Sequence, residues 1–258
     1  ILTTLYFHVM RVNPDAPQAP ERDRFVLSKG HCTPALYSTM AQRGFFPLEE
    51  LKQFRRIEGH MSGHAEMRHV KGVDMSTGSL GQGISAAVGM ALAGKADGRD
   101  YRVYALLGDG EIEEGQVWEA AMAAAKYRLD NLCAVVDVNG LQIDGATADV
   151  MPSEPLDQKF EAFNWNVIRV DGHDYAALAE AFAAAAACKG KPTVLLARTV
   201  KGKGVSFMEG DYGWHGKAPN AEQYEKARAE LAALLEPHFH GVEFRRVGRS
   251  SLLVWGIR

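Results

Sequence analysis

The feature that most constrains the fold is a regular alternation of apolar runs and helical patterns over residues 103–199. Apolar runs rich in strand-forming residues, each bounded by turn residues, lie at 103–107, 132–138, 165–170 and 193–199. Helical apolar spacing occupies 116–127, 156–163 and 175–188, between these runs. Strands that alternate with helices of this length form βαβ units. The sequence therefore predicts an α/β fold, with a parallel β-sheet covered by helices on both faces.

Further helical patterns flank this region. An Ala- and Gly-rich helix is predicted at 80–95, shorter helices at 33–43 and 48–56, and an amphipathic helix at 221–235. No repeat or low-complexity linker divides the chain, so we predict one domain over 1–240 and a tail of uncertain structure over 241–258. The chain starts with Ile1, already inside helical spacing, and its last segment continues no preceding pattern. We therefore expect a truncated start and an atypical tail.

Charge and composition exclude several classes of protein. A formal net charge of -3 argues against a nucleic-acid-binding surface, which needs an excess of basic residues. No apolar run approaches the roughly 18 residues of a membrane span, and no segment resembles a signal peptide. The three cysteines, Cys32, Cys133 and Cys188, show no paired spacing. They indicate a reducing compartment, and we expect a cytoplasmic protein.

A carboxylate stands between two glycines where the predicted strand 103–107 ends. Gly108-Asp109-Gly110 follows this strand, and Asn139 follows the next one. Ligands bind at the carboxyl ends of the strands in open parallel sheets, so both side chains should lie on one rim. Their oxygens suit Mg²⁺, which takes its remaining ligands from phosphates and water. Gly110 lets the backbone approach a phosphate, so the pair predicts a diphosphate held through Mg²⁺, whereas an isolated Gly-Asp-Gly would more often be structural.

Five segments together carry a resemblance to a known family. They read "RDRFVLSKGHCTPALY", "VDMSTGSLGQGISAAVGMALA", "LLGDGEIEEGQVWEAAMAAAKYRLDNL", "NGLQIDG" and "DYGWHG". In this order they resemble the amino-terminal, thiamine diphosphate-binding portion of transketolase over roughly residues 1–235. The resemblance is greatest to the separate amino-terminal subunit found where the enzyme is split over two chains.

The resemblance implies a set of cofactor and metal ligands. Asp109, the Asn139 side chain and the Leu141 carbonyl would bind Mg²⁺ or another divalent cation such as Ca²⁺ or Mn²⁺. Gly110 and Asn139 would also contact the diphosphate of thiamine diphosphate. The pocket against the cofactor rings would be lined by Gly78, Ser79 and Leu80. The same glycine-rich segment would also serve as a closely packed start of a helix.

Three histidines in loop-like sequence also coincide with family positions. The resemblance assigns His31 and His215 to the diphosphate and substrate channel, and His64 to substrate hydroxyls and proton transfer. A loop histidine is otherwise most often a solvated residue, and we expect that of His60 and His69. Glu114 corresponds to acids that link two active sites across a subunit interface, although a solvated helix start explains it equally well.

The implied reaction is transfer of a two-carbon ketol unit from a ketose phosphate to an aldose phosphate in the pentose phosphate pathway. The Glu that activates the aminopyrimidine belongs to a second, pyrimidine-binding domain in this family. We therefore expect an oligomer with a carboxy-terminal partner subunit, and no turnover by the chain alone. The alternatives are a related enzyme such as 1-deoxy-D-xylulose-5-phosphate synthase, and a non-catalytic cofactor-binding fragment. A nicotinamide-binding enzyme is disfavoured, because no G-x-G-x-x-G follows a first strand.

Overall fold

A five-stranded parallel sheet forms the centre of the molecule. The computed structural model describes residues 1–237, 240–247 and 251–257, with side chains up to residue 237. The strand order is β1-β2-β3-β7-β6, and all four neighbouring pairs are parallel. The strands are β1 Arg24–Leu27, β2 Val103–Gly108, β3 Leu132–Val138, β6 Asn166–Asp171 and β7 Thr193–Arg198. The predicted parallel sheet is confirmed, with each of the four predicted strands in its expected place.

The edge strand β1 was not predicted from the sequence. It has only four residues, three of them buried, and its apolar part directly follows the charged segment at 21–24. Such a short continuous run lacks the alternation that identifies a half-buried strand. Pairing of Arg24 with Val103 and of Leu27 with Leu106 adds it to the edge of β2.

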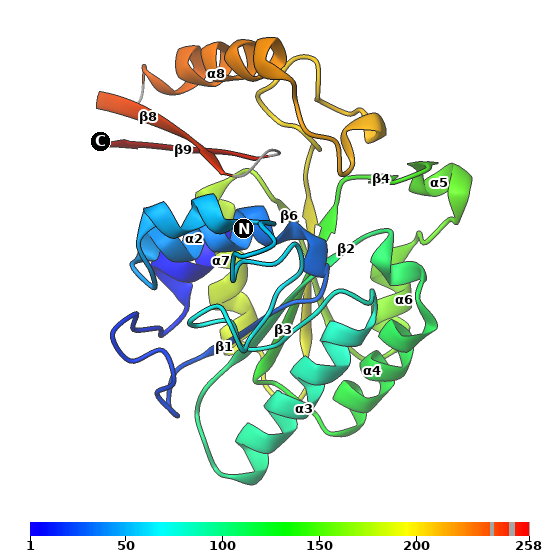
Figure 1. The fold of residues 1–258 in the computed structure, drawn as a ribbon. Helices are drawn as coiled ribbons and strands as arrows, with labels where there is room; N and C mark the ends of the chain where they lie inside the picture. The colour runs from blue at the N-terminus through cyan, green and yellow to red at the C-terminus, as the bar shows by residue number, and fades with distance from the viewer. Residues whose placement is uncertain (238–239, 248–250, 258) are drawn as a thin grey trace.

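Helices cover both faces of the sheet, as predicted (Figure 1). One face carries α2 Thr33–Arg43, α7 Tyr175–Ala187 and the amino-terminal helices, α1 Leu2–Thr4 and a π-helix at Leu5–Val9. The other carries α3 Gln82–Ala96, α4 Gly115–Lys126 and α6 Leu156–Ala162. Alternate strand residues enter the two cores: Val135 packs on the first face and Val136 on the second. Because the central strands β2, β3 and β7 are covered on both faces, most of their residues are apolar and buried.

The remaining elements lie mostly beyond the carboxyl ends of the strands. They are the short strands β4 Leu141–Gln142 and β5 Gly145–Ala146, then α5 Thr147–Val150, and the helix α8 Ala221–Leu235 after a long loop (Figure 1). The backbones of β8 His240–Val247 and β9 Ser251–Ile257 pair antiparallel. The predicted domain boundary at residue 240 stays a prediction.

The helix predicted over 48–56 was wrong in type and length. The structure has a 3-10 helix at Leu48–Gln53, and the chain then turns at Arg55, whose φ is 54°. A β-carbon at Gly59 would lie 2.3 Å from the Gln53 carbonyl oxygen, so the following loop folds tightly back on this segment. This close return leaves no room for further helical turns.

None of the helices within the described residues is both long and apolar enough to cross a membrane.

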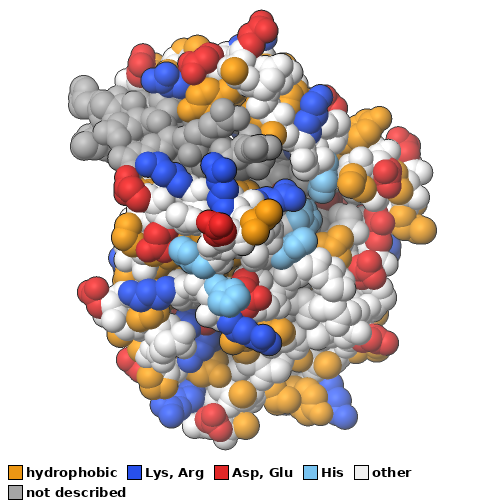
Figure 2. All heavy atoms as spheres, viewed as in Figure 1, with side chains coloured by type: hydrophobic (Ala, Val, Ile, Leu, Met, Phe, Trp, Pro, Cys, Tyr) orange, Lys and Arg blue, Asp and Glu red, His pale blue; other side chains and the backbone are white. Residues whose placement is uncertain are grey.

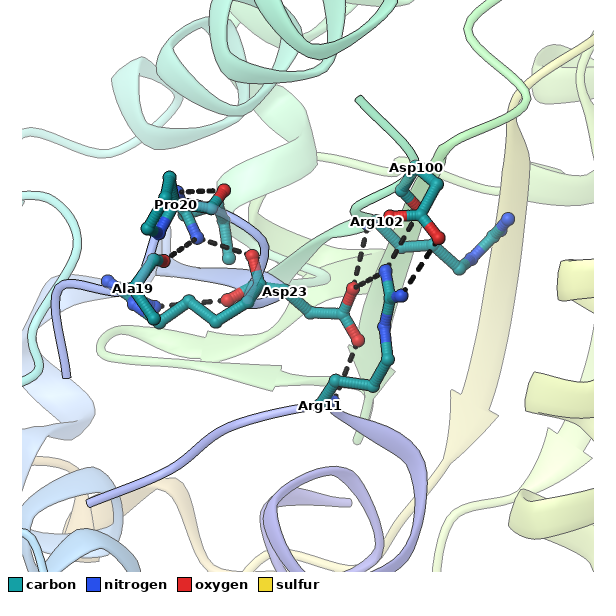
Figure 3. A network of polar contacts seen from close by, with 8 residues as sticks. Arg11, Ala19, Pro20, Asp23, Asp100 and Arg102 are labelled. Carbon is teal, nitrogen blue, oxygen red and sulfur yellow. Dashed lines mark hydrogen bonds and ion pairs between the residues drawn. The ribbon is translucent and has the colours of Figure 1, made fainter. Parts of the chain in front are cut away.

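A buried carboxylate ties the amino-terminal segment to the start of the sheet (Figure 3). Asp23 is 2% exposed and accepts hydrogen bonds from the backbone N–H of Arg11 at 2.8 Å and of Arg102 at 2.8 Å. The Arg11 guanidinium reaches both Asp23 at 3.1 Å and Asp100 at 3.0 Å. These bonds join the strand starts of β1 and β2, at the opposite end from the residues predicted to bind the cofactor.

Two of the glycines in α3, Gly83 and Gly89, provide a test of the packing. A β-carbon at buried Gly83 would lie 2.6 Å from Ser28 Cα, whereas one at exposed Gly89 would meet nothing within 4 Å. We expect Gly83→Ala to lower the free energy of unfolding by about 1–3 kcal/mol. Gly89→Ala should raise it by about 0.5–1 kcal/mol through helix propensity. Urea unfolding of both variants measures this, and equal effects would contradict the packing of α3 on β1.

Candidate functional site

Asp109 stands directly after β2 and connects it to the neighbouring strand end. Its side chain is 3% exposed, and its two oxygens accept hydrogen bonds from the N–H groups of Gly110 at 3.0 Å and Gly140 at 2.5 Å. Burial raises the pKa of this carboxyl group, and the two backbone hydrogen bonds oppose the rise. A buried carboxylate at a strand end therefore has the surroundings in which a cation would be stabilising.

Asn139 and Leu141 follow β3 in the turn that closes against Asp109. The Asn139 side-chain oxygen accepts a hydrogen bond from the Leu141 N–H at 3.1 Å, and its amide nitrogen donates to Asp137. The turn passes through Gly140, whose φ of 74° suits glycine, and Leu141 enters β4. The structure thus brings the predicted metal ligands to one rim.

The donor set is one carboxylate, one amide and one backbone carbonyl. Among the described residues there is no group of three or more His, Cys, Asp or Glu side chains placed to hold a metal ion. Mg²⁺ is commonly bound through one or two carboxylates and completed by phosphate and water. The residues present therefore fit Mg²⁺ that arrives with a phosphate-containing ligand.

An ion pair beneath this rim was missed in the sequence analysis. Lys29, after β1, pairs with Asp137 near the end of β3, with side chains 12% and 20% exposed, and Thr199 donates a hydrogen bond to the same carboxylate. Burial opposes ionisation of Asp137, but Lys29 and these hydrogen bonds hold its pKa below the ordinary value. Lysines and aspartates near loops are usually solvated, so only the parallel register reveals the pair.

The Gly78 segment packs directly on the loop that carries His31. A β-carbon at Gly30 would lie 2.6 Å from Thr77 Oγ1 and 2.7 Å from the Gly78 nitrogen. A β-carbon at Gly78 would lie 3.2 Å from the His64 ring. The loops that carry Gly30, His64 and Gly78 therefore pack against one another, and the contacts are close because two of these positions are glycine. Ser79 is exposed and Leu80 half-buried beside them.

His31 and His215 meet although 184 positions separate them in the sequence. Their ring centroids lie 5.2 Å apart, with the planes tilted by 44°. The pKa of each ring is lowered by burial first, and also by the charges of Lys29 and Lys201. His215 Nδ1 is inaccessible to solvent and has no hydrogen-bond partner among the residues that the structure describes. An unpaired buried nitrogen beside two cations fits an anionic ligand.

Lys201 is a second residue that the sequence analysis missed. It follows β7 in the loop 199–204 and acts electrostatically on both histidines. Figure 2 shows histidine side chains gathered on this face, with Lys and Arg side chains beside them. The KGKG sequence of the loop looks like an ordinary solvated turn, and no spacing signal distinguishes it.

Glu111 is a third missed residue, and Glu114 lies close to it. Glu111 is 2% exposed, whereas Glu114 is exposed at the start of α4, with its Cβ 2.7 Å from the position of a β-carbon on Gly81. The acidic run at 111–114 therefore has a buried member and a solvent-facing one.

His60, hydrogen-bonded to Glu50 at 3.0 Å, and His69 are exposed, as expected.

Comparisons with known proteins identify chains similar to this one. The family described as transketolase, thiamine diphosphate binding domain, matches residues 1–240. The chain is 48% identical over 231 residues to a 6-deoxy-6-sulfo-D-fructose transketolase subunit of a Clostridium species, covering 90% of this chain and 84% of that protein. It is 45% identical over 236 residues to a subunit of the apulose-4-phosphate transketolase of Phocaeicola vulgatus, covering 92% of this chain and 84% of that protein.

Longer relatives match over part of their length. Human transketolase is 44% identical over 237 residues, which cover 92% of this chain but only 37% of the human protein. The crystal structure of transketolase from Campylobacter jejuni superposes with a TM-score of 0.78 and 32% identity, covering 89% of this chain and 37% of that chain. The chain thus spans over a third of these full-length proteins.

Lys201 can be tested through the titration of the two histidines. Replacement by Met removes a charge that lowers both pKa values, so we expect Lys201→Met to raise the pKa of His215 and of His31. Lys217, which lies over the Trp214 ring, supplies the matched control Lys217→Met. Histidine NMR titrations measure both rings, and equal shifts in the two variants would contradict the placement of Lys201.

The lowered pKa values also set a direction for stability. An imidazole whose pKa is lower in the folded than in the unfolded chain binds fewer protons when folded. We therefore expect the free energy of unfolding to fall as the pH drops below the ordinary histidine pKa, and this fall to be smaller in His215→Gln. Urea titrations between pH 5 and 8 measure it, and an unchanged slope would contradict the burial of His215.

Proposed function

Because this chain belongs to the transketolase family and comprises its thiamine diphosphate-binding domain, we propose that it holds Mg²⁺ and the cofactor diphosphate at the carboxyl-end rim. The observation that carries this proposal is the hydrogen bond from the Gly140 N–H to Asp109. It joins the two strand ends that bear the proposed metal ligands Asp109, Asn139 and the Leu141 carbonyl.

The anionic end of the cofactor would be held by residues around this metal. Gly110 and Asn139 would contact the diphosphate, and His31, His215 and Lys201 would face it from the opposite side. The buried, unpaired His215 Nδ1 supports this arrangement. An unprotonated phosphate oxygen can only accept hydrogen bonds, and this nitrogen would donate one to it. The segment of Gly78, Ser79 and Leu80 would lie against the rings.

When bound, thiamine diphosphate supplies the electron sink that allows a carbon–carbon bond beside a carbonyl to be broken and formed. This chain's own residues would bind and orient the reactants. His64, whose ring lies over Gly78, would hydrogen-bond substrate hydroxyls and move a proton there. The lowered pKa values of His31 and His215 favour the neutral imidazole, which would present one donor and one acceptor nitrogen.

The proposed reaction is transfer of a two-carbon ketol unit from a ketose phosphate to an aldose phosphate, as in the pentose phosphate pathway. Two relatives are named for a sulfonated and a phosphorylated sugar, so an anionic end group on the sugar is the shared feature of the proposed substrates. The free thiols of Cys32, Cys133 and Cys188 support a cytoplasmic location.

We further propose that a second unit completes the active site. Two relatives are named as transketolase subunits, which supports an oligomer whose partner is a carboxy-terminal transketolase subunit. That partner would supply the pyrimidine-binding half of the site. Exposed Glu114, beside Gly81 near the rim, would face it across the interface.

The metal-dependent binding can be measured directly. Calorimetric titration of thiamine diphosphate should show binding in Mg²⁺ and none in EDTA. Asp109→Ala removes a direct ligand and should weaken this binding by about a hundredfold or more. Asp97→Ala, at an exposed helix end, is the control and should bind like the wild type. Binding by the wild type that is indifferent to Mg²⁺ would contradict the metal site.

The need for a partner can be tested by reconstitution. The purified chain should show no ketol transfer with Mg²⁺ and thiamine diphosphate, and should gain it when the carboxy-terminal transketolase subunit is added. Asp109→Ala with the same partner should remain inactive. Robust turnover by the purified chain alone, measured as formation of sugar phosphate products, would contradict this proposal.

A further inference from the structure

The buried Glu111 carboxylate has no role in the cofactor binding proposed above, yet it accepts three hydrogen bonds. It lies in the 3-10 turn Glu111–Glu113, directly after Gly110. Oε1 accepts from the Ser28 hydroxyl and from the Gly81 N–H at 2.9 Å, and Oε2 accepts from the Gly108 N–H at 3.1 Å. A side chain that is 2% exposed therefore has both oxygens satisfied by the protein.

The three donors lie on three different segments of the proposed site. Ser28 directly follows β1, three positions before His31. Gly81 follows Leu80 and precedes the first turn of α3, and Gly108 precedes Asp109. One carboxylate is thus bonded to the histidine loop, to the segment facing the cofactor rings and to the metal-binding strand end.

Close backbone packing brings these segments together, and the Glu111 carboxylate bonds all three of them at one point. A β-carbon on Gly83 would lie 2.6 Å from Ser28 Cα, so α3 meets the end of β1 with no side chain between them. Gly81 has a φ of 80°, and its N–H belongs to the helix start, where donors lack partners within the helix. Hydrogen bonds to a charged acceptor are stronger than neutral ones, so Glu111 is well suited to hold this junction.

We propose that Glu111 is a positioning residue, which holds the Ser28, Gly81 and Gly108 segments in the arrangement that binds the cofactor without touching the cofactor itself. This inference rests on the proposed function. The chemistry requires a carboxylate, because three donors converge on two oxygens. In Glu111→Gln, one amide oxygen can serve Ser28 and Gly81, but the amide nitrogen then faces the Gly108 N–H, donor against donor.

The test compares cofactor affinity with turnover at saturation. In Mg²⁺, calorimetry on Glu111→Gln should give thiamine diphosphate binding weaker by about tenfold or more, the loss expected for a hydrogen bond to a charged group. Glu180→Gln, exposed on α7, is the charge-matched control and should bind normally. When the partner is present and the cofactor is saturating, kcat of Glu111→Gln should return to near the wild-type value, since the residue touches no reactant.

Hydrogen exchange supplies a readout that does not depend on the cofactor. Amides of 28–31, 78–82 and 108–110 should exchange faster together in Glu111→Gln without added ligand, while α7 stays unchanged. If Glu111→Gln fails to fold, Ser28→Ala and Glu111→Asp carry the same measurements, because Ser28→Ala removes one donor and Glu111→Asp shortens the acceptor.

Each outcome of these experiments either supports or overturns the positioning role of Glu111. Unchanged affinity, or exchange confined to one segment, overturns the positioning role. Loss of kcat at saturating cofactor also overturns it, because that result indicates contact with reactants. If the wild type binds no cofactor, the proposed function is wrong. Hydrogen exchange then still tests the role of Glu111, because faster exchange in all three segments together supports it and unchanged exchange contradicts it.

Discussion

The parallel pairing of β2 with β3 is the constraint on which the candidate site depends. Gly108 lies opposite Asp137 in this register, so the chain leaves the sheet at Asp109 and at Asn139 on the same rim. The hydrogen bond from the Gly140 N–H to Asp109 then closes one strand end on the other. A shift of one residue would turn either side chain toward a helix-covered face, so the register itself creates the oxygen-rich rim.

Charge is concentrated at partly buried positions near the rim. Lys29 and Asp137 neutralise each other beneath the rim, and Lys201 lies near the two histidines above it. Buried pairs of this kind add little net stability, because desolvation offsets their attraction. Here the pair joins the ends of β1 and β3. The hydrogen bonds to the adjoining Asp109 come from two backbone N–H groups.

Close backbone approach is the second means of organisation. Gly30 meets Thr77 and Gly78, and Gly83 meets Ser28, at distances that admit no β-carbon. These contacts bring three loops together without intervening side chains, and the rings of His31 and His215 then come within 5.2 Å. Because the loops are supported by a five-stranded sheet, a glycine-rich sequence becomes a defined surface.

The sequence by itself determined the α/β class, four of the five sheet strands and the pair Asp109 and Asn139 that we propose as metal ligands. Periodicity and strand-end residues are local signals, and the family resemblance added the assignment of His31, His64 and His215. Local signals failed for β1, which is too short to show a period, and for 48–56, where a tight return of the chain shortens the helix.

Only the tertiary structure decided which charges come together and which of them are buried. Lys29, Glu111 and Lys201 lie in segments whose sequence is typical of solvated loops, and their partners are far away in the sequence. Burial and pairing depend on the register of the sheet and on which loops meet above it. These are properties of the folded chain, so no local pattern could distinguish Glu111, 2% exposed, from Glu114 on the surface three residues later.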